Sequence, residues 1–139
     1  MVTDTLAQTL AETNLSAVFS EPNANKRLAA AQTLYHAHVR FYEPGGTEIT
    51  QGGDTDIAGP EGISSQAGKL LDKTPGWKFA LAGPVQKTGD LVVADWKFGP
   101  VGEGGEIVTK QTGTDVFLVR GDKIDQFWVI VDGVSDVKV

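Results

Sequence analysis

Apolar residues recur at helical spacing in three segments of the first half of the chain. These segments predict helices over residues 4–19, 24–38 and 60–74. The apolar side of the first predicted helix is formed by Leu6, Leu10, Ala17 and Val18. In the second predicted helix, Tyr35 falls on the apolar stripe, whereas Arg27 falls on the polar side. Pro22 follows the first helix and Pro75 ends the third, as expected of residues that interrupt helices.

The second half of the chain changes to alternating apolar and polar residues, which is typical of β-strands. After a short extended run over 39–43, the glycine-rich residues 44–60 are expected to form a loop. Strands are predicted over 77–87, 90–99, 105–120 and 123–131, joined by turns at 89–90 and 121–122 and a hairpin loop at 99–105. Helices followed by strands indicate one α+β domain over 1–139, in which the helices cover one face of a curved, mostly antiparallel sheet.

The alternation also predicts which side chains share a face of the sheet. One face of the third long strand holds Ile107, Gly113, Asp115, Phe117 and Val119. One face of the second holds Val92, Ala94, Trp96 and Phe98. In the last strand Phe127, Val129 and Val131 point one way, and Trp128 and Ile130 point the other way. The last strand is therefore apolar on both faces, and its outer face predicts a homodimer.

Composition narrows the classes of function. The chain has 139 residues, no cysteine and a formal net charge of −6. The lack of cysteine excludes disulfides, thiolate catalysis and cysteine-ligated zinc within this chain. The acidic balance argues against nucleic acid and against an anionic membrane surface as partners. No apolar run is long enough to cross a membrane, and residues 1–15 lack the pattern of a secretory signal, so we expect a soluble cytoplasmic protein.

Several short segments, taken together, resemble a known family. They are Phe41–Gly45, Gly59–Ile63, Pro75–Phe79, Thr114–Val119 and Phe127–Asp132. Their order and spacing resemble the nuclear-transport-factor-2-like superfamily, in its SnoaL-like (polyketide cyclase and ketosteroid isomerase-like) branch. The resemblance implies a cone-shaped roll around an apolar pocket, with dimers formed through the outer sheet face. It does not identify an activity, because this fold hosts isomerases, cyclases, dehydratases, epoxide hydrolases and non-catalytic domains.

The resemblance also implies roles for two carboxyl groups. In the ketosteroid isomerase members a general-base carboxylate precedes a proline, and Glu43 holds that position here. Their protonated, hydrogen-bond-donating aspartate corresponds to Asp115, as does the aspartate that acts in polyketide cyclisation. The tyrosine that those isomerases carry on the first helix is replaced by Leu15. This departure argues against steroid isomerisation.

The residue pattern itself is compatible with acid–base chemistry at both positions. Burial of Asp115 among apolar neighbours in mid-strand would keep it protonated, so that it could donate a hydrogen bond to a carbonyl oxygen. The alternative for Asp115 is a salt bridge to a lysine or arginine, or a cap on a β-bulge. Glu43 is expected on the same face of its strand as Phe41. If both face inward, Glu43 could remove a proton next to a carbonyl. The alternative for Glu43 is a solvated carboxylate at the pocket mouth.

The remaining candidates concern the pocket and metals. The residues predicted to line the pocket are Tyr35, Phe41, Trp96, Phe117, Val119, Phe127, Val129 and Val131. No metal site is predicted. His36 and His38 have no clear third ligand and are assigned to the surface or a helix end. The triplet Asp54-Thr55-Asp56 lacks the later ligands of a calcium loop and is expected to be solvated.

Three hypotheses of function follow. The first is an isomerase, cyclase or dehydratase that acts on a small, largely apolar carbonyl compound without a cofactor, with Glu43 as base and Asp115 as acid. The second is a non-catalytic domain that binds a ligand in the same pocket. The third is a protein-interaction domain whose pocket is filled by its own side chains. A cavity below roughly 300 Å³ would favour the third, because it would not hold a drug-sized ligand.

Overall fold

The helices lie on one side of the molecule, and two of them begin at side-chain caps. The computed structural model describes residues 1–44 and 55–137. Helix α1 (Asp4–Thr13) continues into a π-helical turn, η1 (Asn14–Val18), and is followed by α2 (Ala24–Leu34) and α3 (Gly59–Lys73). The Thr3 hydroxyl accepts a hydrogen bond from the Leu6 amide at 3.1 Å, and Asn23 caps α2 in the same way through the Lys26 amide at 3.0 Å. These caps explain why the two helices begin where they do.

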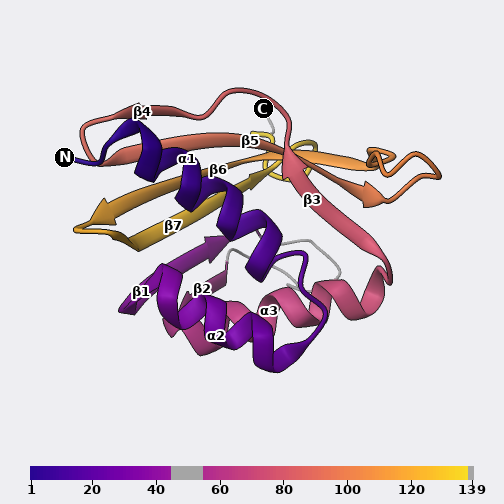
Figure 1. Ribbon diagram of the computed structural model, residues 1–139, viewed down its shortest axis with the longest axis horizontal. Helices are drawn as coiled ribbons and strands as arrows, with labels where there is room; N and C mark the ends of the chain where they lie inside the picture. The colour runs from indigo at the N-terminus through magenta and orange to yellow at the C-terminus, as the bar shows by residue number, and fades with distance from the viewer. Residues whose placement is uncertain (45–54, 138–139) are drawn as a thin grey trace.

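In the described part of the chain, seven strands form one sheet (Figure 1). They are β1 (Tyr35–Glu43), β2 (Thr55–Ala58), β3 (Trp77–Leu81), β4 (Gln86–Thr88), β5 (Leu91–Pro100), β6 (Gln111–Arg120) and β7 (Lys123–Val131). Their order is β2-β1-β7-β6-β5-β3, with β4 also paired to β5. The pair β1–β7 is parallel and the other pairs are antiparallel. The prediction of an α+β fold with a mostly antiparallel sheet is confirmed.

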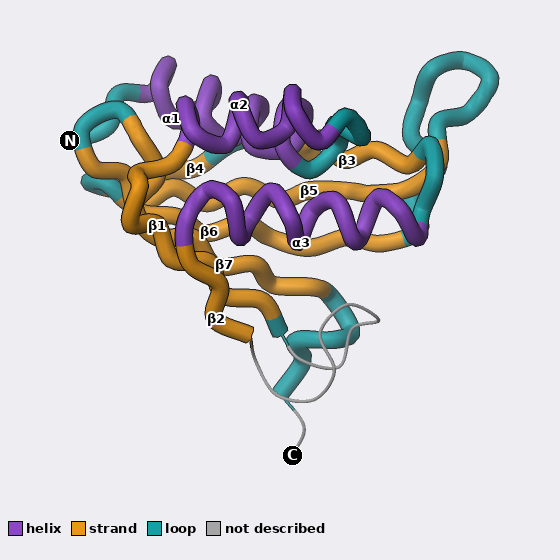
Figure 2. Tube along the Cα trace, turned by 90° about the horizontal axis from the view of Figure 1, so that it is seen from below, coloured by secondary structure: helices purple, strands orange, loops and turns teal. Residues whose placement is uncertain are grey.

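The sheet is curved, and its concave face is covered by the helices (Figure 2). The register of the β6–β7 pairing changes between Leu118 and Val119. The register of the β1–β7 pairing changes between Tyr35 and Arg40. Such irregularities add local twist and bend to a strand. The curved sheet and the helices together form an open cone.

The apolar core lies between the helices and the concave face of the sheet. Its centre is aromatic: the Phe41 and Phe127 rings lie 4.6 Å apart between centroids, and Phe19 meets both edge-on. The parity predicted for β5 and β6 is confirmed, because its members are buried: Val92, Ala94, Trp96, Phe98, Gly113, Asp115, Phe117 and Val119. One face of each central strand therefore supplies the core, and Asp115 enters it with them.

The second helix is shorter than predicted, and the strand after it is longer. Helix α2 ends at Leu34, and Tyr35 is the first residue of β1. Ala31 and Tyr35 are four residues apart, which fits a helix, but Tyr35 pairs with Ile124 of β7. Pairing with a buried strand outweighs local spacing here. Consequently His36 lies on a strand, where its Nε2 is 2.8 Å from the carbonyl oxygen of Arg120, and His38 lies exposed on the same strand.

Two predicted strands have different limits in the structure. The strand predicted over 77–87 is divided into β3 and β4 by a segment that contains Pro84, which cannot donate to a ladder. The strand predicted from 105 begins at Gln111, so Ile107 does not share the face of Asp115. Instead, the Val108 amide donates to the carbonyl of Pro100 at 2.8 Å as the chain folds back along β5.

The predicted loop 44–60 and the predicted polar face of α2 also need correction. Strand β2 and the start of α3 at Gly59 lie within the loop range; Asp54 lies outside the described residues. Arg27 is not on a solvated face, because only 7% of it is exposed. Its guanidinium donates to the carbonyl oxygens of Ser64 and Glu21, both at 2.8 Å. Arg27 therefore ties α2 to α3 and to the chain before α2.

Candidate functional site

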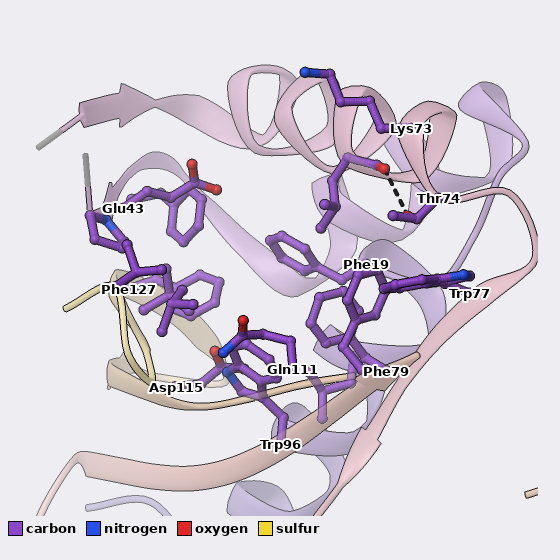
Figure 3. A pocket seen from close by; sticks show the side chains of 18 residues that line it. Phe19, Glu43, Lys73, Thr74, Trp77, Phe79, Trp96, Gln111, Asp115 and Phe127 are labelled. Atoms are coloured by element: carbon purple, nitrogen blue, oxygen red, sulfur yellow. Dashed lines mark hydrogen bonds between the residues drawn. The ribbon is translucent and has the colours of Figure 1, made fainter. Parts of the chain in front are cut away.

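A cavity of about 460 Å³ lies inside the cone, between the helices and the concave face of the sheet (Figure 3). Most of its wall is apolar, with rings from Phe19, Phe41, Trp77, Phe79, Trp96, Phe98 and Phe127. Its polar side chains are Glu43, Lys73, Thr74, Gln111 and Asp115. The volume exceeds the limit below which a drug-sized ligand would be excluded. An apolar wall with a few polar groups is the usual build of a small-molecule site.

The structure brings together five of the eight residues predicted to line the pocket. These are Phe41, Trp96, Phe127, Val129 and Val131. Phe117 and Val119 instead belong to the packed core. Phe117 is 0% exposed and Val119 is 5% exposed. Tyr35 is buried at the start of β1, behind the cavity wall. Phe117 and Val119 were placed in the lining from strand alternation, and Tyr35 from its position on the stripe of the predicted second helix. Neither pattern shows how far along a strand the cavity extends.

Asp115 lines the cavity from β6 and is buried, with 3% of the residue exposed. Its Oδ2 accepts a hydrogen bond from Asn14 Nδ2 at 3.2 Å. Burial raises the pKa of Asp115 to about 8, although contacts with Asn14 and Trp96 act to lower it. Both of these neighbours are uncharged, so neither compensates a buried negative charge as a lysine or arginine would. Asp115 is therefore mostly a neutral acid near pH 7.

Asn14 links Asp115 to a buried tyrosine. It occupies the first position of the π-helical turn η1 and is completely buried. Its Oδ1 accepts a hydrogen bond from the Tyr35 hydroxyl, while its Nδ2 donates to Asp115. Burial raises the pKa of the Tyr35 hydroxyl, and the neighbouring Asp115 carboxyl group raises it further. The phenol therefore keeps its proton and acts as a donor.

Trp96 contributes a second buried donor on the same side of the cavity. It lies on β5 opposite Gly113 of β6, two residues from Asp115 along the strand. Its indole lowers the pKa of Asp115, which places its N–H close to the carboxyl group. Nevertheless, Trp96 Nε1 has no acceptor with ordinary hydrogen-bond geometry among the described residues. A buried N–H without an acceptor is uncommon and costs about 1–3 kcal/mol.

Glu43 stands on another part of the cavity wall, at the end of β1 (Figure 3). Its Oε2 accepts a hydrogen bond at 3.0 Å from Nε2 of Gln66 on α3. Burial raises the pKa of Glu43, and the Gln66 amide opposes this shift. A carboxylate with a raised pKa holds a proton more strongly than an exposed one, which suits a general base.

A comparison with protein-family models places the chain in a family. The model of the SnoaL-like domain matches residues 17–127. The chain belongs to the SnoaL-like family. The match extends from the π-helical turn, through the segment that carries Glu43, to Phe127, and it includes Asp115. The predicted resemblance to this branch of the nuclear-transport-factor-2-like superfamily is confirmed.

Solved structures similar to this SnoaL-like domain share its fold. A candidate isomerase of the SnoaL-like family from Agrobacterium tumefaciens has a TM-score of 0.74 at 24% identity, over 93% of this chain and 99% of that one. A candidate SnoaL-like polyketide cyclase from Jannaschia has a TM-score of 0.65 at 13% identity, over 96% and 94%. TerC, co-crystallised with polyporic acid, has a TM-score of 0.65 at 16% identity, over 94% of each chain. No curated protein matches the chain.

Asn14 and Gln111 are among the residues at the SnoaL-like site that escaped the sequence predictions. Asn14 follows Leu10 by four residues and so lies on the apolar stripe of the first helix, where a polar side chain signals a buried partner. Gln111 at the start of β6 also lines the cavity, and its Nε2 donates to the carbonyl oxygens of Thr112 and Asp132 at 2.8 and 2.9 Å. No pattern in the sequence distinguished Gln111 from an exposed strand residue.

No cluster of three or more histidine, aspartate or glutamate side chains suitable for a metal occurs within residues 1–44 and 55–137. In the same part of the chain, every helix is too short or too polar to cross a membrane.

Proposed function

We propose that the cavity binds a small, largely apolar carbonyl compound and catalyses a cofactor-independent acid–base reaction on it, of the isomerase, cyclase or dehydratase kind. The observation that carries this proposal is the buried carboxyl group of Asp115, which lines an apolar cavity and whose pKa is raised by burial to about 8. A carboxylic acid that remains protonated near pH 7 can donate a hydrogen bond to a carbonyl oxygen and stabilise the negative charge that develops there.

In this proposal the two carboxyl groups have complementary roles. Asp115 donates to the carbonyl oxygen, and Glu43 removes a proton from the adjacent carbon to give an enolate. The proton on Glu43 then returns to a different carbon of the substrate, which gives isomerisation. Alternatively, the enolate carbon attacks a second carbonyl carbon, and the alkoxide formed there takes up the proton, which gives cyclisation. The pKa of Glu43 is raised by burial, so this carboxylate is a better base than an exposed glutamate.

The indole N–H of Trp96 supports a carbonyl ligand in particular. It is a buried donor without an acceptor of ordinary geometry in the described part of the chain, and it lies beside Asp115. A ligand oxygen next to Asp115 would satisfy this N–H as well. Two donors on one oxygen favour the enolate over the neutral ketone, because the enolate carries the larger negative charge.

The test is enolisation, measured directly. Exchange of the α-protons of 2-tetralone in D₂O is followed by proton NMR with the wild type and with Asp115→Asn and Glu43→Gln. We expect each substitution to slow exchange by about 10²–10⁴-fold, the usual contribution of a positioned acid or base. Asp95→Asn is the matched control, because Asp95 is an exposed residue of β5. Exchange that is equally fast in wild type and Asp115→Asn would contradict the proposed role of Asp115.

A second candidate function is ligand binding without catalysis. It is favoured by the loss of the first-helix tyrosine, since Leu15 lines the cavity at that position. Native mass spectrometry of the purified protein distinguishes the candidates when combined with the exchange assay. A co-purified molecule that the protein binds without catalysing exchange supports the second function.

We also propose that the protein is a cytoplasmic homodimer, joined through the outer face of the sheet. The support is the apolar character of that face: Trp128 and Tyr42 stack with ring centroids 5.6 Å apart, and Ile130 is 44% exposed. The acidic net charge of −6 supports a partner other than nucleic acid.

A further inference from the structure

Three buried polar groups form a chain of hydrogen bonds behind the cavity wall. The Tyr35 hydroxyl donates to Asn14 Oδ1, and Asn14 Nδ2 donates to Asp115 Oδ2 at 3.2 Å. The exposed fractions of Tyr35, Asn14 and Asp115 are 1%, 0% and 3%. The three come from β1, η1 and β6, which meet only in the folded protein. Of the three, Asp115 alone lines the cavity.

The direction of the two hydrogen bonds is set by the chemistry of the groups. An amide oxygen can only accept, and an amide NH₂ can only donate. If the Asn14 amide turned over, its NH₂ would face Tyr35, and the buried phenolic proton would lose the acceptor that it has now. An unsatisfied buried donor costs about 1–3 kcal/mol. The Tyr35 proton therefore favours the amide orientation in which Asn14 presents an N–H to Asp115.

This orientation decides where the Asp115 proton can reside. Oδ2 already receives an N–H from Asn14, and a proton on the same oxygen would compete with that hydrogen bond. The neutral carboxyl group is therefore better satisfied with its proton on Oδ1. We propose that Tyr35 and Asn14 are positioning residues: together they hold Asp115 so that its acidic proton lies on Oδ1, available to a ligand oxygen in the cavity.

The π-helical turn provides a structural reason for this role. The Phe19 amide donates to the Asn14 carbonyl oxygen at 3.2 Å, so the turn closes over five residues instead of four. Single π-helical turns of this kind are frequent at functional sites. Asn14 begins the turn and is buried, next to a first helix whose ordinary α-helical part ends at Thr13. The catalytic part of this inference rests on the proposed function, whereas the positioning itself does not.

The test follows the titration of Asp115 in the ligand-free, full-length protein. Carbon-13 NMR of the aspartate carboxyl groups gives the midpoint of the Asp115 titration. The Asp115 signal is assigned as the one that is missing from the spectrum of Asp115→Asn. In Asn14→Leu we expect the midpoint to move upward, because the carboxylate loses a donor that stabilises its charged form. In Tyr35→Phe we expect a shift in the same direction, because the released amide can turn its oxygen toward the protonated Asp115. Tyr42→Phe is the matched control: Tyr42 is on the same strand but stacks on Trp128, and its substitution should leave the midpoint unchanged.

The outcomes separate the positioning role from the proposed function. A Tyr35→Phe protein that keeps the wild-type midpoint, with an otherwise preserved amide spectrum, would overturn the role of Tyr35 in holding Asn14. If Asn14→Leu does not fold, Tyr35→Phe still tests the positioning role, because this substitution removes only a hydroxyl group. Unchanged proton exchange of 2-tetralone in Asp115→Asn would refute the proposed function and leave this titration unaffected, since no ligand is present in it.

Discussion

Asp115 shows how strand alternation alone can produce a neutral acid. It occupies a position on β6 whose neighbours on the same face, Gly113 and Phe117, are buried against the helices. The carboxyl group therefore loses its water, and the groups that contact it, Asn14 and Trp96, supply hydrogen-bond donors but no positive charge. Desolvation outweighs these donors, and the pKa rises to about 8. The sequence-based alternative, a salt bridge to lysine or arginine, has no counterpart among the contacts found for Asp115.

The raised pKa of Asp115 predicts a specific dependence of stability on pH. The unfolded aspartate has a pKa of about 3.9, so between about pH 4 and the folded pKa of about 8 the folded protein binds more protons than the unfolded chain. The contribution of Asp115 to the free energy of unfolding therefore falls as pH rises through this window and levels off above it. Asp115→Asn removes this contribution, because a neutral amide has no charge to bury.

Urea denaturation of wild type and Asp115→Asn at pH 5, 6, 7 and 8 measures this effect. We expect the variant to gain stability relative to the wild type as pH rises, by a few kcal/mol in all, on the order of 1.4 kcal/mol per pH unit within the window. Asp95→Asn, on the exposed side of β5, serves as control and should follow the wild type. A difference between Asp115→Asn and wild type that is constant from pH 5 to pH 8 would contradict the neutral state of Asp115.

At the residue level, the sequence predicted single positions better than pairs. The alternation of side chains along β6 was sufficient to predict that Asp115 faces the core, since Phe117 and Val119 lie on the same face of the strand. The partner Asn14 lies 101 residues away, and its hydrogen bond depends on how η1 packs against the sheet. Likewise the contact between Glu43 and Gln66 joins β1 to α3. Such contacts between distant segments have no local signal in one sequence.

At the scale of elements, the pairing of β5 with β6 shapes the cavity wall through one glycine. Gly113 lies opposite Trp96 in the antiparallel pair. A Cβ atom at Gly113 would lie 2.2 Å from Cζ2 of Trp96 and 2.3 Å from the carbonyl oxygen of Ile130. The indole of Trp96 therefore occupies the space that a side chain at position 113 would need. This close approach keeps the Trp96 N–H beside Asp115.

Gly113→Ala should consequently destabilise the pairing of β5 with β6 and displace Trp96 in the cavity wall. Because the clash involves backbone on one side and a buried ring on the other, neither neighbour can move freely, and we expect a loss of about 1–3 kcal/mol in the free energy of unfolding. The indole N–H resonance of Trp96 should also shift. Gly83→Ala is the control, because no atom lies within 4 Å of a Cβ built there. Equal stability of the two variants in urea would show that Trp96 does not need this space.

Two of the elements that were predicted wrongly share a physical cause. Helix α2 ends at Leu34 because Tyr35 pairs with Ile124, although the spacing of apolar residues continued the helix. Strand β6 starts at Gln111 because the chain before it folds back along β5, where the Lys110 amide donates to Phe98 at 2.9 Å. In both cases a contact with a distant strand decides between local alternatives. Elements with strong local signals, such as α1 with its cap at Thr3, began where they were predicted.

For the whole molecule, the order of elements was sufficient to predict the architecture but not the activity. Helices followed by strands left one face of a curved sheet to be covered, and the family match agrees with that arrangement. The similar solved structures share at most 24% identity in the comparisons described above, so they support the fold alone. What distinguishes this chain is the set of side chains within the cone, and these determine which reaction is possible.

The same architecture leaves the convex face of the sheet without helices, and this predicts the state of assembly. On that face Ile130 of β7 is 44% exposed, beside the stacked rings of Tyr42 and Trp128. Burying an apolar face of this kind against a second copy is favourable by roughly 25 cal/mol per Å². We therefore expect light scattering with size-exclusion chromatography to give twice the chain mass of 14.7 kDa. Ile130→Glu should shift the protein toward the monomer, because each dimer would bury two new charges.

Val108→Glu is the matched control for the dimer prediction. Val108 is 43% exposed, almost the same fraction as Ile130, but it lies in the segment between β5 and β6 and not on the convex face. A dimer that survives Val108→Glu and dissociates in Ile130→Glu locates the interface on β7. A wild-type protein that elutes with the mass of a single chain would refute the dimer. It would then follow that stacking of Tyr42 on Trp128 reduces the exposed apolar surface enough for the convex face to stay solvent-exposed in a monomer.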